Sequence, residues 1–451
     1  MYFDLYNDVV SEPEKLLAHL RPHILKFMSN QPLTALVLGA GARGTFAYAP
    51  FALKHPDQLE IVAVAEPDAF RRHRLSTEHD IRPKLQFTTW QDALAQPKMA
   101  DVIINTTQDQ MHHESTLAAL AAGYDVLLEK PITNTLAETV ELIHAAERHG
   151  RLLQICHVLR YTNFFAKLHD IVQSGRLGDI VNVTHRENVR YTHMAHSFVR
   201  GSWRNSAESS PMILAKCCHD LDILQWNIGQ PVTHLQSFGS LMHFRPANAP
   251  ANATRRCTAP CPAADDCPFD ARRHYLNPAN KNWARKIADS FQPDAIQHAL
   301  ETGPYGRCVY HCDNDVVDHQ TVNMRFANGA TVTLIMQGHS HDESRTMRYD
   351  GTRATLRGKF DYANGWIEIH DHLTDQVETL IIPAGDSGHG GGDMGIIESF
   401  VQAVRGGAPA MTTARESLES HLLAFAAEES RHNHTVINFE AYRQQHTKKT
   451  E

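Results

Sequence analysis

Two short motifs contain the residues of this sequence whose types and spacing are best suited to chemistry. The first, Gly39-Ala40-Gly41-Ala42-Arg43-Gly44, has the G-x-G-x-x-G spacing of a pyrophosphate-binding turn between a strand and a helix. The second, Glu129-Lys130-Pro131, follows the predicted strand 125–128 with its apolar residues 126–128, so the Lys130 ammonium lies at the carboxyl end of that strand. Ligands of open parallel sheets bind at those ends. Together the motifs predict a nicotinamide enzyme with Lys130 near the reacting carbon.

Glu66 indicates which dinucleotide the first motif would hold. It ends the second predicted strand, about 20 residues beyond the glycine turn, where a carboxylate accepts hydrogen bonds from the adenosine ribose hydroxyls. The same negative charge repels a 2′-phosphate, which favours NAD over NADP. Arg71, Arg72 and Arg74 follow closely and are the residues that could hold that phosphate instead.

A second candidate for proton transfer is His219, within Lys216-Cys217-Cys218-His219-Asp220-Leu221-Asp222. We expect a helix over 214–227, in which His219 and Asp222 share one face because they are three residues apart. Asp222 would then orient the imidazole and set its tautomer. The alternative is a histidine paired with a carboxylate for structure only.

Composition restricts the class of protein. The 451 residues are 42% hydrophobic and 21% charged, with a formal net charge of −8, which is ordinary for a globular protein of two domains. A mildly acidic chain has no electrostatic reason to bind nucleic acid or an anionic membrane. We see no signal peptide and no apolar run of membrane-spanning length, and therefore expect a cytoplasmic protein.

The predicted elements divide the chain into an α/β protein of two main domains. Strands and helices alternate over 33–157, which predicts a Rossmann doubly wound parallel sheet. Over 158–385, short alternating strands and turn signals predict an α/β domain with a large open, mostly antiparallel sheet. An amphipathic helix over 12–29 would form an appendage within residues 1–32, and the helices of 386–451 would pack back on the core.

Three segments of the second half do not follow this pattern. Residues 245–315 are rich in Pro, Asn, Cys and charge, and predict an irregular insertion. The polar run 310–320 would either face the substrate or form a solvated loop. The stretch Gly388–Gly392 predicts a flexible loop or lid.

Five cysteines fall in or beside the insertion. Three of them form one short loop and two follow later, in a segment with no obvious core. Four thiolates would suffice for a closed structural zinc site, which would supply folding energy to such a loop. Unliganded thiols, disulfides and iron–sulfur ligation are the alternatives, because the spacing is not that of two C-x-x-C pairs. The candidate ligands are Cys257, Cys261, Cys267 and Cys308.

The order and spacing of these motifs resemble the glucose–fructose oxidoreductase / inositol dehydrogenase / rhizopine catabolism (Gfo/Idh/MocA) family over residues 33–430. The resemblance rests on the glycine turn, on Thr107 with His112, and on Glu129-Lys130-Pro131. It continues through Arg160-Tyr161, Ser174-Gly175-Arg176-Leu177-Gly178, and His219 with Asp222 and Trp226.

The resemblance implies an enzyme that oxidises a secondary alcohol of a sugar or cyclitol with NAD or NADP. It also implies a homodimer or homotetramer, because the open sheet of this family often forms an interface. By it, Lys130 contacts the reacting oxygen and His219 is the acid/base. Further residues are implied at the cofactor (Thr106, Thr107, His112, Glu129) and, more loosely, at the substrate (Arg160, Asp222).

One departure leaves the proton relay open. Many members carry an aspartate four residues before the histidine, where this sequence has Ala215. The leading hypothesis is a dehydrogenase of a polyhydroxylated small molecule. The alternatives are an enzyme that cleaves glycosides by transient oxidation with no net redox change, and a non-enzymatic NAD-binding regulator. Accumulation of NADH distinguishes the dehydrogenase from the glycoside-cleaving enzyme and from the regulator.

Overall fold

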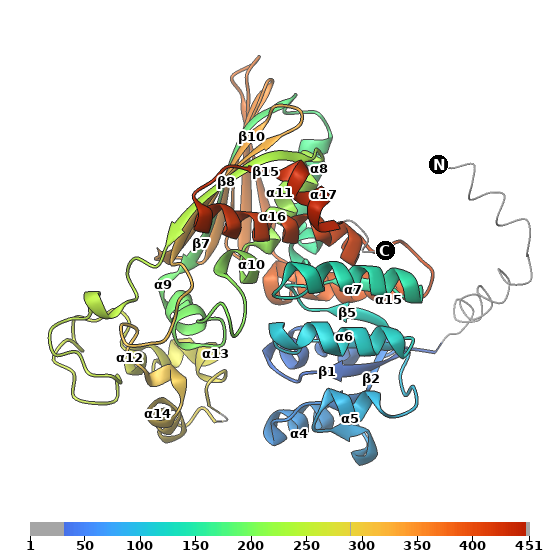
Figure 1. The fold of residues 1–451 in the computed structure, drawn as a ribbon, viewed down its shortest axis with the longest axis vertical. Coiled ribbons are helices and arrows are strands. Elements are labelled where there is room, and N and C mark those ends of the chain that lie inside the picture. Colours follow the sequence, from blue (N-terminus) through green and yellow to red (C-terminus); the bar gives the residue numbers. More distant parts are fainter. Residues whose placement is uncertain (1–30, 289, 448–451) are drawn as a thin grey trace, which may run out of the picture.

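The computed structural model describes residues 31–288 and 290–447 (Figure 1). The predicted helix over 12–29 lies outside the described residues. Among the helices that are described, none combines the length and the apolar character needed to cross a membrane.

The first domain is built on a six-stranded sheet in the order β3-β2-β1-β4-β5-β6, in which every pairing is parallel. The strand order reverses between β1 and β4, and ligands of doubly wound sheets bind at that point. The predicted Rossmann fold is confirmed. Its strands are β1 (Leu33–Leu38), β2 (Leu59–Ala65), β3 (Gln86–Phe87), β4 (Val102–Asn105), β5 (Asp125–Leu128) and β6 (Leu153–Ile155).

Helices on both faces connect these strands, and local signals set their ends. In α7 (Leu136–His149) the hydroxyl of Thr135 accepts the amide N–H of Glu138 at the amino terminus. Gly150 ends the helix with φ +58°, a conformation that glycine adopts without strain. The others are η1 (Arg43–Tyr48), α3 (Pro50–Lys54), α4 (Ala69–Glu78), α5 (Trp90–Leu94) and α6 (His112–Ala121).

The second domain contains a nine-stranded sheet in the order β14-β13-β12-β11-β7-β10-β9-β8-β15. Only the β7–β10 pairing is parallel among the described strands, so the predicted antiparallel character is confirmed. The strands are β7 (Ile180–Arg190), β8 (Val232–Ser240), β9 (His319–Phe326), β10 (Thr331–Ser340), β11 (Ser344–Gly351), β12 (Ala354–Phe360), β13 (Asn364–Asp371), β14 (Val377–Pro383) and β15 (Ile437–Asn438).

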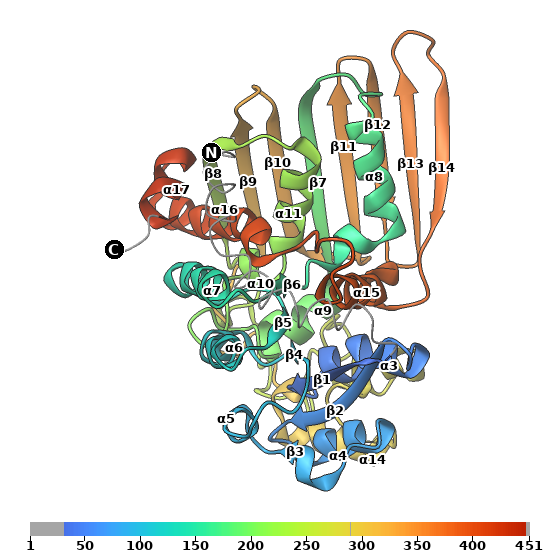
Figure 2. The same cartoon turned by 90° about the vertical axis from the view of Figure 1, so that its right-hand side faces the viewer.

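Helices cover one face of this sheet (Figure 2), namely α8 (Asn163–Gln173), α11 (Cys218–Ile228) and α16 (Ala414–Asn433), while α17 (Phe439–Thr447) packs on β8. On strands of the sheet, Val181 is 54% exposed and Ile381 is 69% exposed. The expected homodimer or homotetramer stays a prediction.

Three sequence-based expectations differ from the structure. Strands β8 and β9 were not predicted, because polar residues such as Ser237 and Gln320 occupy some of their buried positions and interrupt the apolar alternation. The helix expected over 214–227 is two helices, α10 (Met212–Ala215) and α11, separated at Lys216 and Cys217. The insertion is not wholly irregular, since it contains α12 (Ala271–Tyr275), α13 (Lys281–Ala284) and α14 (Pro293–Thr302).

The glycine-rich stretch leads directly into a packed helix, and its flexibility stays a prediction. Helix α15 (Gly392–Val404) starts there, and its apolar side chains share a buried cluster with residues of β1 and β2. Figure 2 shows α15 between the two sheets. A Cβ on Gly392 would lie 2.2 Å from the carbonyl oxygen of Val158, and one on Gly388 would lie 2.0 Å from the Asp393 carboxylate. These glycines allow close approach, which the sequence alone did not reveal.

Candidate functional site

The glycine turn has the geometry that a dinucleotide requires. Gly39 has φ +86°, and a Cβ on it would lie 2.7 Å from the carbonyl oxygen of Thr106. A Cβ on Gly44 would lie 2.3 Å from the carbonyl oxygen of Gly39, so the third glycine lets η1 pack against the turn. A Cβ on Gly41 would meet nothing within 4 Å. The middle glycine therefore borders open space, where a pyrophosphate can approach the backbone and the first amides of the helix.

Glu66 lies beside this turn at the end of β2 and is 5% exposed. Its two carboxylate oxygens accept the amide N–H groups of Ala40, at 2.8 Å, and Asp68, at 2.9 Å. A carboxylate has about four acceptor positions, so two remain for hydroxyl groups of a ligand. Of the nearby arginines, Arg72 donates to the main-chain oxygen of Glu66, and Arg74 lies over the rings of Phe46 and Phe70.

The loop after β4 carries the next three predicted cofactor residues. The Thr106 hydroxyl donates to the carbonyl oxygen of Gly39 at 2.5 Å, and the Thr107 hydroxyl donates to the side chain of Asn105 at 2.9 Å. His112 has no exposed surface, and its ring nitrogens lie 2.7 Å from the oxygen of Pro131 and 3.1 Å from that of Thr107. His112 therefore connects the loop at Thr107 to the turn at Pro131. Because its side chain is fully buried, a bound ligand cannot contact it.

Arg43 and Glu129 belong to a charged network that joins three segments. The Arg43 guanidinium lies 2.5 Å from the Glu129 carboxylate and 2.8 Å from that of Asp393, in α15. The Tyr48 hydroxyl also donates to Glu129, at 2.5 Å. Burial lowers the pKa of Arg43, but Asp393 and Glu129 outweigh burial and raise it overall. Burial raises the pKa of Asp393, but Arg43 and His389 outweigh burial and hold it well below its usual value.

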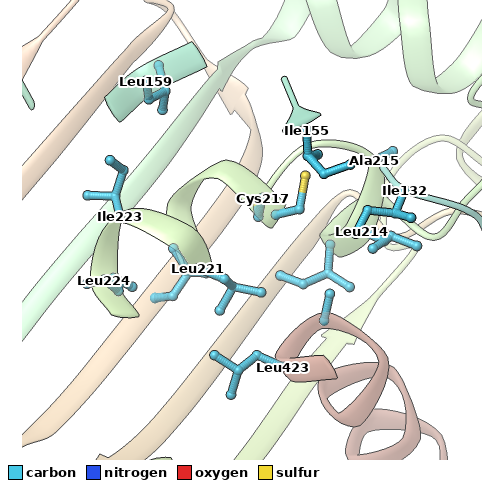
Figure 3. Packing of buried hydrophobic residues seen from close by; sticks show 14 of the residues in the cluster. Ile132, Ile155, Leu159, Leu214, Ala215, Cys217, Leu221, Ile223, Leu224 and Leu423 are labelled. Carbon is cyan, nitrogen blue, oxygen red and sulfur yellow. The ribbon is translucent and has the colours of Figure 1, made fainter. Parts of the chain in front are cut away.

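Lys130 reaches from the end of β5 to the second domain. Its ammonium donates to the main-chain oxygen of Ala215 at 2.6 Å. Ala215 belongs to a buried apolar cluster with Ile132 and Ile155 from the first domain and Leu214 beside it (Figure 3). The acceptor that residue 215 offers Lys130 is therefore its main-chain carbonyl, and the alanine side chain adds no charge.

His219, at the start of α11, is 5% exposed, and its Nδ1 has no hydrogen-bond partner. Burial, together with the positive charge of Lys130, lowers the pKa of His219 well below its ordinary value. Its ring centroid lies 5.6 Å from that of His157 and 6.2 Å from that of His389. The imidazole is therefore neutral at neutral pH, which is the form that accepts a proton.

The predicted pairing of His219 with Asp222 is wrong. Asp222 instead binds Arg160 through two hydrogen bonds of 2.6 and 2.7 Å, and Arg160 also lies over the ring of Trp226. Asp222 is 2% exposed and Arg160 is 7% exposed. The pair is therefore a buried structural ion pair, and little of its surface is accessible to a substrate. Spacing of three residues puts two side chains on one face of a helix, but the guanidinium from a distant segment is the stronger partner for a carboxylate.

A second buried network beneath α11 was not predicted. Arg345, from β11, lies 2.8 Å from Asp220 and 2.6 Å from Glu187. Lys216 pairs with Glu187 at 3.2 Å and with Glu343 at 3.1 Å. Lys216 is thus held by two carboxylates and does not replace the missing acid at Ala215. Lys216 and Asp220, on either side of Cys217 and His219, were the local signs of this network, and its other members, Glu187, Glu343 and Arg345, are far away in the sequence.

The four candidate zinc ligands line one cavity of the insertion, but the described residues contain no group of three or more His, Cys, Asp or Glu placed to hold a single metal ion. The structure therefore does not form the predicted single-ion site. The polar run 310–320 does not present a common face to a substrate: Asp318 is buried and accepts the amide N–H groups of Met242 and His243.

Two family models match the chain. Residues 33–157 match the oxidoreductase family NAD-binding Rossmann fold, and residues 170–439 match the oxidoreductase family C-terminal alpha/beta domain. The chain belongs to the Gfo/Idh/MocA oxidoreductase family. The two domain types of the family are those that the sequence predicts, an NAD-binding Rossmann domain followed by an α/β domain.

Curated relatives agree with this assignment. The chain is 21% identical over 328 residues to the putative oxidoreductase YteT of Bacillus subtilis, a match that covers 68% of this chain and 74% of that protein. It is 27% identical to inositol 2-dehydrogenase 4 of Saccharopolyspora erythraea, over 50% of this chain and 62% of that protein. Several other relatives match over less than half of their own length.

Solved structures share the fold over nearly the whole chain. Levoglucosan dehydrogenase in complex with NADH and levoglucosan superposes with a TM-score of 0.67 and 16% identity, covering 91% of this chain and 100% of that one. Aldose-aldose oxidoreductase from Caulobacter crescentus superposes with a TM-score of 0.65 and 14% identity, covering 90% and 100%.

The buried histidines of this Gfo/Idh/MocA member should make its stability depend on pH. Burial lowers the pKa of His157 to about 4 and that of His421 to about 3, against about 6.5 in the unfolded chain. The unfolded chain therefore takes up protons first, so stability is full above pH ~6.5 and falls as the pH drops toward 4. Each such histidine lowers the free energy of unfolding by up to about 1.4 kcal/mol per pH unit.

Urea denaturation between pH 7 and 4.5 measures this slope. His157→Gln should reduce the slope, whereas His341→Gln should leave it unchanged because the side chain of His341 is 94% exposed. Equal slopes in all three proteins would contradict the assignment to His157.

Removing the charge of Asp222 tests its partnership with Arg160. Asp222→Asn leaves a buried guanidinium without its carboxylate, which should lower the free energy of unfolding by about 3 kcal/mol. Glu147→Gln is the control, since it breaks an exposed pair with Arg415 and should cost less than about 1 kcal/mol. Unchanged stability of Asp222→Asn, with an altered pH profile of activity, would return Asp222 to a role in orienting His219.

Proposed function

We propose that this protein is an NAD-dependent dehydrogenase that transfers a hydride between a secondary alcohol of a sugar, cyclitol or related polyol and nicotinamide. The observation that carries the proposal is the position of Lys130. Its ammonium extends from the strand end near the glycine turn to Ala215, four residues before the neutral His219. A cation and a neutral base are thus available in one region that both domains form.

The residues of the first domain fit a dinucleotide. The backbone at Gly41 faces open space, and the Thr106 hydroxyl fixes the turn through Gly39. Glu66 supports NAD over NADP, because its buried carboxylate is held beside the turn by two amides and would repel a 2′-phosphate. Arg72 and Arg74 already have partners of their own, so neither is committed to a phosphate. When bound, NAD supplies the hydride acceptor.

The side chains of Lys130 and His219 then have separate roles, stabilisation of charge and transfer of a proton. The Lys130 ammonium attracts the hydroxyl oxygen as negative charge develops on it, and the Ala215 carbonyl holds the ammonium in position. Neutral His219 takes the hydroxyl proton, and its protonated form returns the proton in the reverse reaction.

The names of relatives support a polyhydroxylated substrate. Inositol 2-dehydrogenases and a 1,5-anhydro-D-fructose reductase are among the curated relatives, and one solved structure of the same fold holds levoglucosan with NADH. The shared feature of these names is a secondary alcohol on a ring bearing several hydroxyls. A panel of inositols, anhydrosugars and aldoses is therefore the first set of substrates to test.

Lys130→Met should remove the charge that stabilises the oxygen and retain the volume of the side chain. We expect kcat to fall by about 10²- to 10⁴-fold, with binding of NADH unchanged. His219→Asn should lower kcat by a similar factor and remove the proton-accepting group. Formation of NADH, followed by its absorbance, measures turnover, and NADH fluorescence measures binding.

Lys54→Met is the matched control, because Lys54 is an exposed lysine at the end of α3 and should retain full activity. Unchanged turnover in Lys130→Met would reject the role of the lysine. Cleavage of a glycoside without accumulation of NADH would replace the dehydrogenase with the redox-neutral reaction and leave both residues in place.

Glu66→Gln tests the preference for NAD. The substitution removes the negative charge but retains a side-chain oxygen, so repulsion of the 2′-phosphate is lost. The ratio of kcat/KM with NAD to that with NADP should fall by about 10-fold or more, because two like charges held together cost several kcal/mol and each ~1.4 kcal/mol is a factor of ten. An unchanged ratio would show that Glu66 does not determine the preference for NAD over NADP, and Arg71 would be the next residue to examine.

A further inference from the structure

The insertion over 245–315 has little apolar material to hold it together. Its own buried cluster contains five residues, and short helices and turns make up most of the rest. Units with so small a core are usually stabilised by a disulfide or a metal. All eight cysteines of the chain are free in this structure.

Four cysteines of this insertion surround one cavity. Main-chain hydrogen bonds bring the distant segments together: the amide of Cys257 donates to the oxygen of Gly306, and the amide of Cys308 donates to that of Arg255. Cys261 and Cys267 complete the lining, together with Asp270 and Tyr310. Cys312 lies outside the lining, and its thiol donates to the main-chain oxygen of Cys308 at 3.3 Å.

Three of the four sulfur atoms accept main-chain hydrogen bonds. In each case the donor is the amide two residues later in the chain: Ala263 for Cys261, Phe269 for Cys267 and Tyr310 for Cys308. The backbone therefore folds closely around these three sulfur atoms and fixes their positions at the cavity.

Two arginines supply positive charge around the cavity. The Arg200 guanidinium lies 3.6 Å from the sulfur of Cys257 and also acts electrostatically on Cys267 and Cys308. Arg272 acts on Cys257 and Cys261. Four thiolates around a metal centre leave a net negative charge, which these side chains would offset.

The spacing of the cysteines distinguishes between one metal ion and several. Zinc requires sulfur atoms at about 2.3 Å from the ion. The cavity has a volume of about 20 Å³, and atoms that line a space of water size lie more than ~3 Å from its centre. No three of these ligands converge on a single point within the described residues. A group of several metal ions bridged by sulfide fills such a space.

We propose that Cys257, Cys261, Cys267 and Cys308 bind an iron–sulfur cluster. Four cysteine thiolates are the ligand set of both [2Fe–2S] and [4Fe–4S] clusters. The cluster joins the loop before α12 to the segment after α14, and in this way it supports the whole insertion. The insertion in turn contacts the first domain, because the Arg285 guanidinium lies 4.4 Å from the ring centroid of Phe46, in the helix after the glycine turn.

Metal and sulfide analysis of the full chain, purified without oxygen from iron-supplied cells, tests the proposal. We expect about two to four iron atoms and as many acid-labile sulfides per chain, with visible absorbance that dithionite bleaches. Cys261→Ser and Cys267→Ser should each lose most of the iron and sulfide. Cys312→Ser is the matched control and should keep both.

The remaining outcomes overturn the proposal. One zinc per chain with no sulfide would show that the cysteines close around a single ion. Neither iron nor zinc in a stably folded wild-type protein, or in one reconstituted with ferrous iron and sulfide, would show that these are free thiols. Equal loss of iron in Cys312→Ser would show unfolding of the insertion and not loss of a ligand. Since the metal content of the wild-type chain is measured directly, the result does not depend on the dehydrogenase activity.

Discussion

The ion pairs of Arg43 with two buried carboxylates are the constraint on which the rest of the site depends. Arg43 lies at the start of the helix after the glycine turn and binds Glu129, at the end of β5, and Asp393, in α15. The side chains of Glu129 and Asp393 are only 8% and 1% exposed, and removal of one partner from a buried ion pair costs about 3 to 5 kcal/mol. The glycine turn, the strand end that carries Lys130 and helix α15 are therefore held in one arrangement.

The second domain contributes through an interrupted helix. Because α10 ends at Ala215 and α11 begins at Cys218, the carbonyl of Ala215 is free to accept Lys130. Buried apolar contacts on one side of the break (Figure 3) and the charged network of Arg345 and Lys216 on the other fix its position. His219 follows directly, and it is neutral because the same packing excludes water from it.

Local patterns predicted the structure well where one segment determines the outcome. The glycine spacing and the alternation of strands and helices over residues 33–157 both correspond to the structure. The predicted pairing of Asp222 with His219 failed because the spacing of residues on one helix cannot reveal that Arg160 competes for the carboxylate. Strands β8 and β9 were missed because their buried polar residues take hydrogen-bond partners from distant segments, as Gln320 does with Ser237.

The sequence by itself determined the family, the two domain types and the residues most suited to chemistry, Gly39–Gly44, Lys130 and His219, since these depend on residue type and short spacing. The tertiary structure alone decided the partners: that Lys130 reaches a carbonyl at Ala215, that Arg43 unites Glu129 with Asp393, and that four cysteines surround one cavity. Contacts between residues tens to hundreds of positions apart follow from the packing of whole elements, and no local pattern carries that information.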